Sequence, residues 1–387
     1  MPVKNRFAEL HSDITEWRRD MHAHPELLFE THRTSALVAE KLRAFGCDEV
    51  VEGIGRTGVV GIIKGKSDTK GQVIGLRADM DALPITEQTG VDYASTNPGA
   101  MHACGHDGHT AMLLGAAQYL AETRNFDGSV AVIFQPAEEG GGGGREMCKD
   151  GMMERFGIQE VYGMHNWPGQ PLGKFAIRPG PFFAATDLFD ITIEGKGGHA
   201  AKPHETIDST LVTAHIITAL QSITSRNADP VSQLVVSVTS IESSSKAYNV
   251  IPQRVMLKGT VRTLSNENRD LAESRMGAIC NGVAEAMGAK AVLNYVRNYP
   301  VMVNSEEQTK FAADVARAVS GDCAEAPLVM GGEDFAFMLE ERPGAYILVG
   351  NGDTASVHHP EYNFNDDAIP AGCSWWAEIV ERRMPAA

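Results

Sequence analysis

The spacing of apolar residues predicts that the chain begins with helices, over residues 6–46. Ile14, Trp17 and Met21 recur at intervals of three and four positions, which places them on one face of a helix. The same spacing continues in the second half of this stretch until Gly46 ends it.

Three short runs of β-branched and aliphatic residues follow, and each has the length of a buried strand. A helical stretch from about residue 108 to 124 separates the last two runs. Strands that alternate with helices favour an α/β fold, with a mixed, mainly parallel sheet flanked by helices. The expected strands are Val59–Ile63, Val73–Leu76 and Val130–Phe134.

The pattern changes after Pro179 and again at Pro300. Between these prolines it predicts paired β-α-β units, typical of one small sheet with two helices on one face. The simplest account is a domain of residues 184–298 inserted into a larger domain that combines residues 1–183 and 299–387. We expect strands at 188–194, 234–241, 255–261, 291–296 and 345–349, and helices at 207–226, 266–287, 308–320 and 375–383.

The composition excludes several classes of partner. The 387 residues include 34 Lys and Arg against 50 Asp and Glu, and this net charge of −16 argues against nucleic acid and anionic membranes. No apolar run approaches the roughly 20 residues of a membrane span, and the first residues lack a secretory signal. The 6 cysteines are widely spaced without a CxxC pair, so we expect reduced thiols in a cytoplasmic protein.

The chemistry concentrates in residues 101–109, which hold three imidazoles, a thiol and a carboxylate just before a predicted helix. Thiolate and imidazole together suit a divalent ion such as zinc. Gly105 permits the tight backbone that lets Cys104 and His106 point at one place. The alternative is a helix-capping histidine beside an inert buried thiol, which explains single residues better than the whole cluster.

A second candidate is the pair Glu138 and Glu139, where the strand pattern of residues 130–134 ends. Adjacent residues of an extended chain point in opposite directions, so one carboxylate can bind metal while the other acts as a general base. Taken alone, the pair is equally well explained as a solvated surface feature. The glycines at 140–144 lack a following Gly-Lys-Ser/Thr, which excludes a phosphate-binding loop.

Three further positions are weaker on their own. His165 follows the strand-like residues 160–162, and His358 precedes His359 and Pro360 late in the chain. Each is also explained as a structural histidine. Asp79 and Asp81 end a predicted strand and suit the orientation of a ligand imidazole, or else form an ordinary turn.

Together and in this order, these segments resemble the metal-dependent N-acyl-amino-acid amidohydrolases. This family includes hippurate hydrolase and the auxin-conjugate hydrolases, and it is a branch of the aminoacylase and carboxypeptidase superfamily. The likeness runs from Arg19 to Phe364, and its specific part is the Cys-Gly-His-Asp-Gly-His block followed by Glu-Glu-Gly. The resemblance implies two divalent ions (zinc, manganese, cobalt or nickel), bound by Cys104, His106, Glu139, His165 and His358. The family pattern His-x-Pro selects His358 over His359.

The resemblance also implies the reaction, which is hydrolysis of the amide bond of an N-acyl amino acid. Hippurate-like, N-acetyl and indole-acyl conjugates are the expected substrates. Glu138 is the implied general base: it takes a proton from a metal-bound water, the hydroxide attacks the carbonyl carbon, and Glu138 returns the proton to the amine. Asp81 is expected to assist this chemistry.

For the inserted domain, the resemblance implies a ferredoxin-like lid that also forms a homodimer or a dimer-based oligomer. His199 is expected to reach the partner's active site and polarise the oxyanion, although a glycine-rich turn explains it equally simply. Asn249 and Arg262 are expected to bind substrate, although Arg262 also fits an exposed strand position. The loop at residues 330–335 is expected to line the substrate pocket.

Two alternatives remain open. One is a related dipeptidase or deacetylase, against which Cys104 and Asp79 argue, because many relatives have an acidic ligand and a histidine there. The other is a non-catalytic protein that binds metal or ligand. Glu138 argues against this second alternative, because binding alone needs no base.

Overall fold

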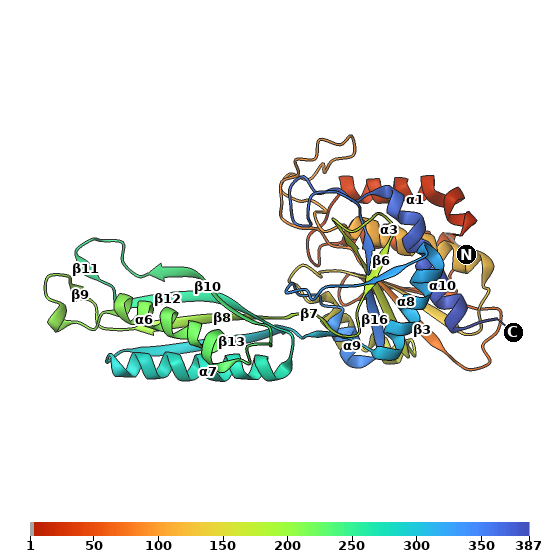
Figure 1. The fold of residues 1–387 in the computed structure, drawn as a ribbon. Coiled ribbons are helices and arrows are strands. Elements are labelled where there is room, and N and C mark those ends of the chain that lie inside the picture. The colour runs from red at the N-terminus through yellow and green to blue at the C-terminus, as the bar shows by residue number, and fades with distance from the viewer. Residues whose placement is uncertain (1–3, 387) are drawn as a thin grey trace. The chain divides into compact units, whose positions relative to one another are not determined.

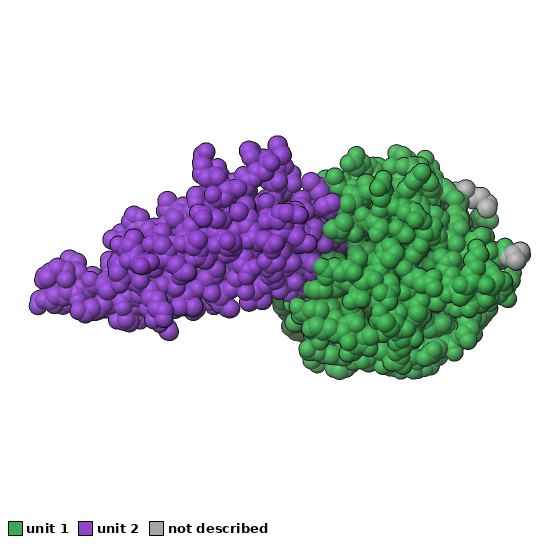
Figure 2. Space-filling model, turned by 90° about the horizontal axis from the view of Figure 1, so that it is seen from below, with its two compact units in different colours: residues 1–180, 303–327, 334–387 green, residues 181–302, 328–333 purple. Residues whose placement is uncertain are grey.

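The computed structural model describes residues 4–386, which form two compact units (Figures 1 and 2). The first unit, green in Figure 2, holds the described residues up to Gly180 together with residues 303–327 and those from Asp334 onward. The second unit, purple in Figure 2, holds residues 181–302 and 328–333.

Residues 328–333 join the second unit through backbone contacts. The N–H of Ala184 donates hydrogen bonds to the carbonyl oxygens of Val329 and Gly331, at 3.0 and 2.9 Å. From the sequence, these residues were expected to belong with 299–387, because a loop has no hydrophobic periodicity that would assign it to either sheet.

An eight-stranded sheet forms the centre of the first unit. Its strands are β1 (Glu49–Ile54), β2 (Gly58–Lys64), β3 (Val73–Asp79), β4 (Ser129–Gln135), β5 (Glu160–Trp167), β6 (Phe175–Ile177), β15 (Cys323–Glu325) and β16 (Gly344–Gly350). They are arranged in the order β1-β2-β4-β3-β5-β16-β6-β15. The neighbours β4, β3, β5 and β16 run parallel, whereas β1 and β2 pair antiparallel. The expected mixed, mainly parallel sheet is therefore confirmed.

Helices cover this sheet (Figure 1). They are α1 (Asn5–Ala23), α2 (His32–Ala44), α3 (His106–Thr123), α4 (Gly143–Lys149), α5 (Met152–Arg155), α8 (Glu306–Ser320), α9 (Ala336–Glu341) and α10 (Ile369–Arg383). Helix α3 packs on β3, α1 and α10 pack on α3, and α4 packs with α5 and α9. Strands β3 and β4 are buried almost throughout, as a sheet with helices on it requires. No helix among the described residues has the length and apolar character needed to cross a membrane.

A four-stranded antiparallel sheet and two helices form most of the second unit. The chain order is β8 (Ala185–Glu194), α6 (Ser209–Ser222), β10 (Leu234–Ser243), β12 (Arg254–Thr263), α7 (Asn266–Ala286) and β13 (Lys290–Tyr299), and the strand order is β10-β12-β8-β13. The alternation along β8 explains the packing: Ile191 and Ile193 are buried with helix residues, whereas Leu188 is 50% exposed. Shorter elements of this unit are β9 (Gly198–His199), β11 (Val250–Ile251) and a π-helical turn at Ile223–Asn227. Two further short strands, β7 (Gly180–Phe183) and β14 (Met302–Asn304), each include residues of both units.

Candidate metal centre

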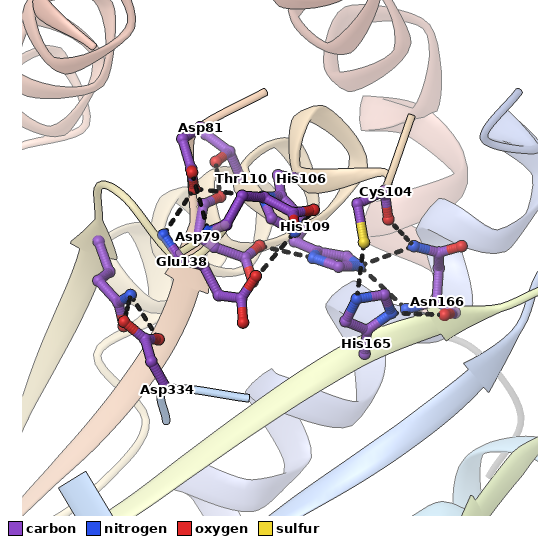
Figure 3. A network of polar contacts seen from close by, with 12 residues as sticks. Asp79, Asp81, Cys104, His106, His109, Thr110, Glu138, His165, Asn166 and Asp334 are labelled. Atoms are coloured by element: carbon purple, nitrogen blue, oxygen red, sulfur yellow. Dashed lines mark hydrogen bonds and ion pairs between the residues drawn. The ribbon is translucent and has the colours of Figure 1, made fainter. Parts of the chain in front are cut away.

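Side chains from separate segments meet at one edge of the large sheet. Strand β3 ends at Asp79, β4 ends at Gln135 and β5 carries His165, and these strands are parallel neighbours. The carboxyl ends of parallel strands meet at one edge, so the residues that follow them come together there. The start of α3 joins the same cluster, as Figure 3 shows.

The structure brings all five predicted metal ligands together. Cys104, His106 and His165 offer ligand atoms that lie within 4.8 Å of one another, and so do Cys104, Glu139 and His358. Nε2 of His165 lies 3.4 Å from Sγ of Cys104, and Nε2 of His358 lies 3.2 Å from Oε1 of Glu139. Cys104 belongs to both groups, so its sulfur is close to the ligand atoms of each.

Of the two neighbouring histidines late in the chain, His358 is the one that reaches this cluster. The carboxylate paired with His359 is that of Glu361, at 3.9 Å. His358 has a φ of +66°, uncommon for a residue other than glycine, and its N–H donates to the carbonyl oxygen of Ala103 at 2.7 Å. This hydrogen bond ties the His358 loop to the segment that carries Cys104.

Gly105 lets the backbone turn into α3. Its φ is +86°, and a Cβ atom there would lie 2.4 Å from the side-chain nitrogen of Asn166. Helix α3 begins directly afterwards, at His106 and not near residue 108 as the apolar pattern predicted. His106 and His109 are therefore one helical turn apart and project from the same face.

Glu138 and Glu139 lie in a turn after β4, so the expected extended backbone is wrong at this point. The turn follows Ala137, whose φ is +55°. The two carboxylates therefore do not point in opposite directions. Instead, one oxygen of each lies within 4.8 Å of the other and of a ring nitrogen of His106. Glu138 is only 7% exposed, so a buried carboxylate accompanies the predicted ligands.

Asp81 holds this turn in place. Its Oδ1 accepts a hydrogen bond from the backbone N–H of Glu138 at 2.9 Å, and its Oδ2 accepts one from the N–H of Glu139 at 3.1 Å. Oδ1 also lies 3.4 Å from Nδ1 of His106. Asp81 thus contacts a predicted ligand imidazole, as the sequence suggested. It also fixes the backbone of both glutamates, which the sequence pattern did not indicate.

The charges and unpaired atoms of the cluster suit a cation. Burial alone would lower the pKa of His106, but Asp79, Asp81 and Glu139 outweigh it and raise that pKa to about 10. Burial and the nearby carboxylates raise the pKa of the Cys104 thiol well above its ordinary value. Both ring nitrogens of His106 are buried without a hydrogen-bond partner among the described residues. A divalent cation would bind a ring nitrogen of His106 and stabilise the Cys104 thiolate.

One buried polar residue beside the cluster, Arg77, was given no role from the sequence. Arg77 is fully buried on β3 and donates to Asp79 at 2.8 Å and to Asp334 at 3.0 Å. Asp79 also lies 2.6 Å from Nδ1 of His109 and 3.7 Å from Nε2 of His106, so it contacts a predicted ligand imidazole as expected. A charged residue in the middle of an apolar strand, such as Arg77, was the available signal.

In the second unit, the structure places His199 and Asn249 beside each other. His199 lies on β9 and pairs with Val250 on β11. The N–H of Ala200 donates to the carbonyl oxygen of Asn249 at 3.0 Å. The side chains of His199 and Asn249 are both exposed.

Arg262 lies away from these two residues, near the other end of β12. Figure 1 shows β9 and β11 at the end of the unit where β12 begins with Arg254. Arg262 is eight positions further along the strand, which corresponds to about 26 Å. One copy of the second unit therefore does not bring the side chains of His199 and Arg262 together. Nη1 of Arg262 is buried and has no hydrogen-bond partner among the described residues.

The resemblance implied a metal centre of this composition. Comparison with known proteins confirms the family. The chain belongs to Peptidase family M20/M25/M40, whose model matches residues 75–382.

Individual relatives match almost the whole chain. It is 42% identical to hippurate hydrolase from Campylobacter jejuni over 377 residues, which are 96% of this chain and 97% of the relative. It is 37% identical to N-acetylcysteine deacetylase from Bacillus subtilis over 375 residues, 96% of each protein. The crystal structure of a dinuclear metal-binding M20 peptidase from Bacillus subtilis matches with a TM-score of 0.86 and 34% identity, over 97% of this chain and 99% of the other.

Proposed function

We propose that this chain is a metal-dependent hydrolase that cleaves the amide bond of N-acyl amino acids. The observation that carries the proposal is the cluster of five predicted ligands with the buried carboxylate of Glu138 beside them. A protein that only binds metal needs the ligands but has no use for such a base. Membership of the M20 peptidase family supports hydrolysis of an amide.

The proposed cofactor is a pair of divalent cations, held by Cys104, His106, Glu139, His165 and His358. When bound, such ions acidify water and polarise a carbonyl group. The overlap of two ligand groups at Cys104 supports a pair of ions rather than a single one. Thiolate, imidazole and carboxylate donors together can bind zinc, manganese, cobalt or nickel. The metal therefore has to be identified by loading the protein with each of these ions separately.

Glu138 is the proposed general base. Its carboxylate accepts a proton from the attacking water and then delivers this proton to the departing amine nitrogen, which returns Glu138 to its starting state. The bond between the carbonyl carbon and the amide nitrogen breaks, and the products are a carboxylic acid and an amino acid. Asp81 positions Glu138 through the hydrogen bond to its backbone N–H.

We propose that residues 184–298 form a ferredoxin-like lid and dimerisation domain. The β-α-β-β-α-β order and the antiparallel sheet support this assignment. His199 of a partner copy is proposed to polarise the oxyanion, and Asn249 and Arg262 to bind substrate. A separation of about 26 Å along β12 supports the dimer, because one small substrate cannot contact His199 and Arg262 of the same copy.

The proposed substrates are hippurate-like, N-acetyl or indole-acyl amino acids. The names of three relatives support this range: hippurate hydrolase, N-acetylcysteine deacetylase and N-acetyldiaminopimelate deacetylase. The deacetylases also favour a second candidate, an enzyme that removes acetyl groups from one biosynthetic intermediate. We further propose a cytoplasmic location, which the six free cysteines support.

The test is a matrix of metals and substrates. Purified protein is loaded separately with zinc, manganese, cobalt and nickel, and its metal content is measured. Each form is then incubated with hippurate, N-acetylcysteine, N-acetyldiaminopimelate, an indole-acyl amino acid and a dipeptide. We expect release of a free amino acid from at least one N-acyl substrate. Hydrolysis of the dipeptide alone would replace the proposal with a peptidase, and a fully metal-loaded protein without any hydrolysis would overturn it.

A further inference from the structure

One buried histidine beside the metal centre is not among the predicted ligands. His109 is 0% exposed, and both of its ring nitrogens are occupied by protein groups. Nδ1 lies 2.6 Å from Oδ1 of Asp79, and the backbone N–H of Asn166 donates to Nε2 at 2.9 Å. A backbone N–H can only donate, so Nε2 carries no proton and Nδ1–H donates to Asp79. The protein thus holds the His109 ring in a single orientation through hydrogen bonds at both nitrogens.

Asn166 connects His109 to two predicted ligands. Its side-chain nitrogen donates to the carbonyl oxygen of Cys104 at 2.6 Å and lies 3.0 Å from Nε2 of His109. Its side-chain oxygen accepts a hydrogen bond from the hydroxyl group of Tyr362 at 2.7 Å. Figure 3 shows Asn166 joined in this way to Cys104, His109 and His165. Every polar atom of the Asn166 amide group is therefore engaged.

The backbone of Asn166 also sets the orientation of His165. Nδ1 of His165 donates to the carbonyl oxygen of Asn166 at 2.6 Å, which leaves Nε2 unprotonated and facing Sγ of Cys104 at 3.4 Å. A metal-binding imidazole needs this arrangement, with one nitrogen donating to the protein and the other presenting its lone pair. The N–H and the carbonyl group of one residue thus connect His109 to the ligand nitrogen of His165.

We propose that His109 is a positioning residue for the metal centre. By accepting a hydrogen bond from the Asn166 N–H and donating one to Asp79, it fixes the strand residue that orients His165 and anchors the backbone of Cys104. This inference rests on the proposed metal-dependent function, but it concerns residues that do not themselves bind the ions.

His109 could instead be a metal ligand, but its hydrogen bonds exclude that role. Asp79, His106 and His109 offer atoms within 4.8 Å of one another, so proximity alone allows them to bind a metal. The two ring nitrogens of His109 are already engaged, and the Oδ2 atom of Asp79 accepts a hydrogen bond from Arg77 at 2.8 Å. Asp79 and His109 therefore support the predicted ligands instead of forming a separate metal site with His106.

The experiment measures cobalt binding to the whole chain. His109→Phe keeps a ring at this position and removes both hydrogen bonds. We expect its cobalt affinity, measured by competition with a chelator, to fall about 10- to 100-fold. In the cobalt-loaded protein, the thiolate-to-cobalt charge-transfer band reports on Cys104 directly, and we expect this band to weaken or shift.

A matched control comes from the same segment. His102 is also buried, but neither of its ring nitrogens has a hydrogen-bond partner among the described residues. We expect His102→Phe to keep the wild-type cobalt affinity and band. Tyr362→Phe removes only the hydroxyl group that donates to Asn166, and it remains informative if His109→Phe does not fold. We expect it to lower cobalt affinity about fivefold, the effect of one hydrogen bond.

Each outcome supports or overturns the proposal. Wild-type affinity and band in His109→Phe, or in Tyr362→Phe when His109→Phe does not fold, would overturn it. An equal loss of affinity in His102→Phe would also overturn it, because the effect would then be one of packing. A wild-type protein that binds cobalt with a thiolate band but hydrolyses no substrate would contradict the proposed function alone.

Discussion

The predicted metal ligands come together within one compact unit, whereas the candidate residues of the second unit do not. In the first unit, Cys104, His106 and His165 are buried and lie within ligand distance of one another. In the second unit, His199 is exposed, and Arg262 has a buried guanidinium nitrogen without a hydrogen-bond partner among the described residues. Burial lowers the pKa of Arg262, and the negative charge of Asp187 offsets this only in part.

Roles can be assigned from one chain where the interacting groups belong to that chain. The predicted ligands of the first unit come together at one edge of its sheet, so their positions indicate a common purpose. The candidate residues of the second unit make contacts that do not indicate a role: Nδ1 of His199, for example, accepts a hydrogen bond from the backbone N–H of Ala201. Their proposed roles depend on a surface outside the second unit, and experiments on two chains together are the way to test them.

The largest expected effect is that of metal removal. A chelator should abolish hydrolysis and destabilise the first unit by about 4 kcal/mol for each ion removed, relative to protein with metal at a thousandfold excess over its Kd. All four tryptophans, at 17, 167, 375 and 376, lie in the first unit, so their fluorescence reports its unfolding alone. Far-ultraviolet circular dichroism also senses α6 and α7. Equal shifts of both signals would contradict a metal site confined to the first unit.

The next largest effect is expected from Glu138→Gln. The amide cannot accept the proton of the attacking water, so kcat should fall about 10²- to 10⁴-fold. Metal content should stay at the wild-type level, because Glu138 is not among the proposed ligands. The matched control is Glu139→Gln, which should lose metal. Near-wild-type turnover by metal-loaded Glu138→Gln would remove this residue from the mechanism.

His199→Ala tests the second unit. If this imidazole polarises the oxyanion, kcat should fall about 10²- to 10³-fold while metal content and the tryptophan unfolding transition remain unchanged. Mixing this variant with Glu138→Gln under conditions of subunit exchange should restore activity, because one site of the mixed dimer then has an intact Glu138 and a partner's intact His199. Failure to restore activity would place both residues in one chain's site.

The smallest effect concerns a buried ion pair outside the centre. His22 lies 2.8 Å from Asp107 and 3.1 Å from Glu87. Burial would lower its pKa, but these carboxylates raise it from about 6.5 to about 9. This contribution to stability is fully present below pH 6.5 and is lost as the pH rises through 9, by at most on the order of 3 kcal/mol. Urea midpoints followed by tryptophan fluorescence should show this decline, and His22→Gln should flatten it.

The sequence predicted the helices and strands whose apolar residues recur with a clear period. It misplaced the ends of elements in which polar residues interrupt that period. The alternating residues of 188–194 indicated a strand, and β8 covers this range. By contrast, the strand expected to end near 162 continues to Trp167, so His165 lies inside β5 and not after it. Polar residues at its end hid the continuation, because they are buried in the network of Asn166 and not exposed to solvent.

The same division applies to the candidate site. The sequence alone pointed to Cys104 and His106, because they are close in the chain and because their type implies metal chemistry. Glu139, His165 and His358 were predicted as ligands through the family resemblance, since each of them also fits a structural or solvated role. The residues that support the predicted ligands, such as Arg77 and Asn166, could not be identified in this way. Arg77 is separated from Asp334 by 257 positions, and Asn166 from Tyr362 by 196, and no local pattern indicates such contacts.

The sequence was enough to predict the class of fold, the residue types of the candidate metal centre and the division of the chain into two kinds of sheet. These properties follow from periodicity and from side-chain chemistry, which are local. The sequence could not show which carboxylate holds the glutamate turn, which tautomer His165 adopts or that Arg262 lies far from His199. Hydrogen bonds between distant segments fix these details, and such bonds exist only when the strands and helices have packed together.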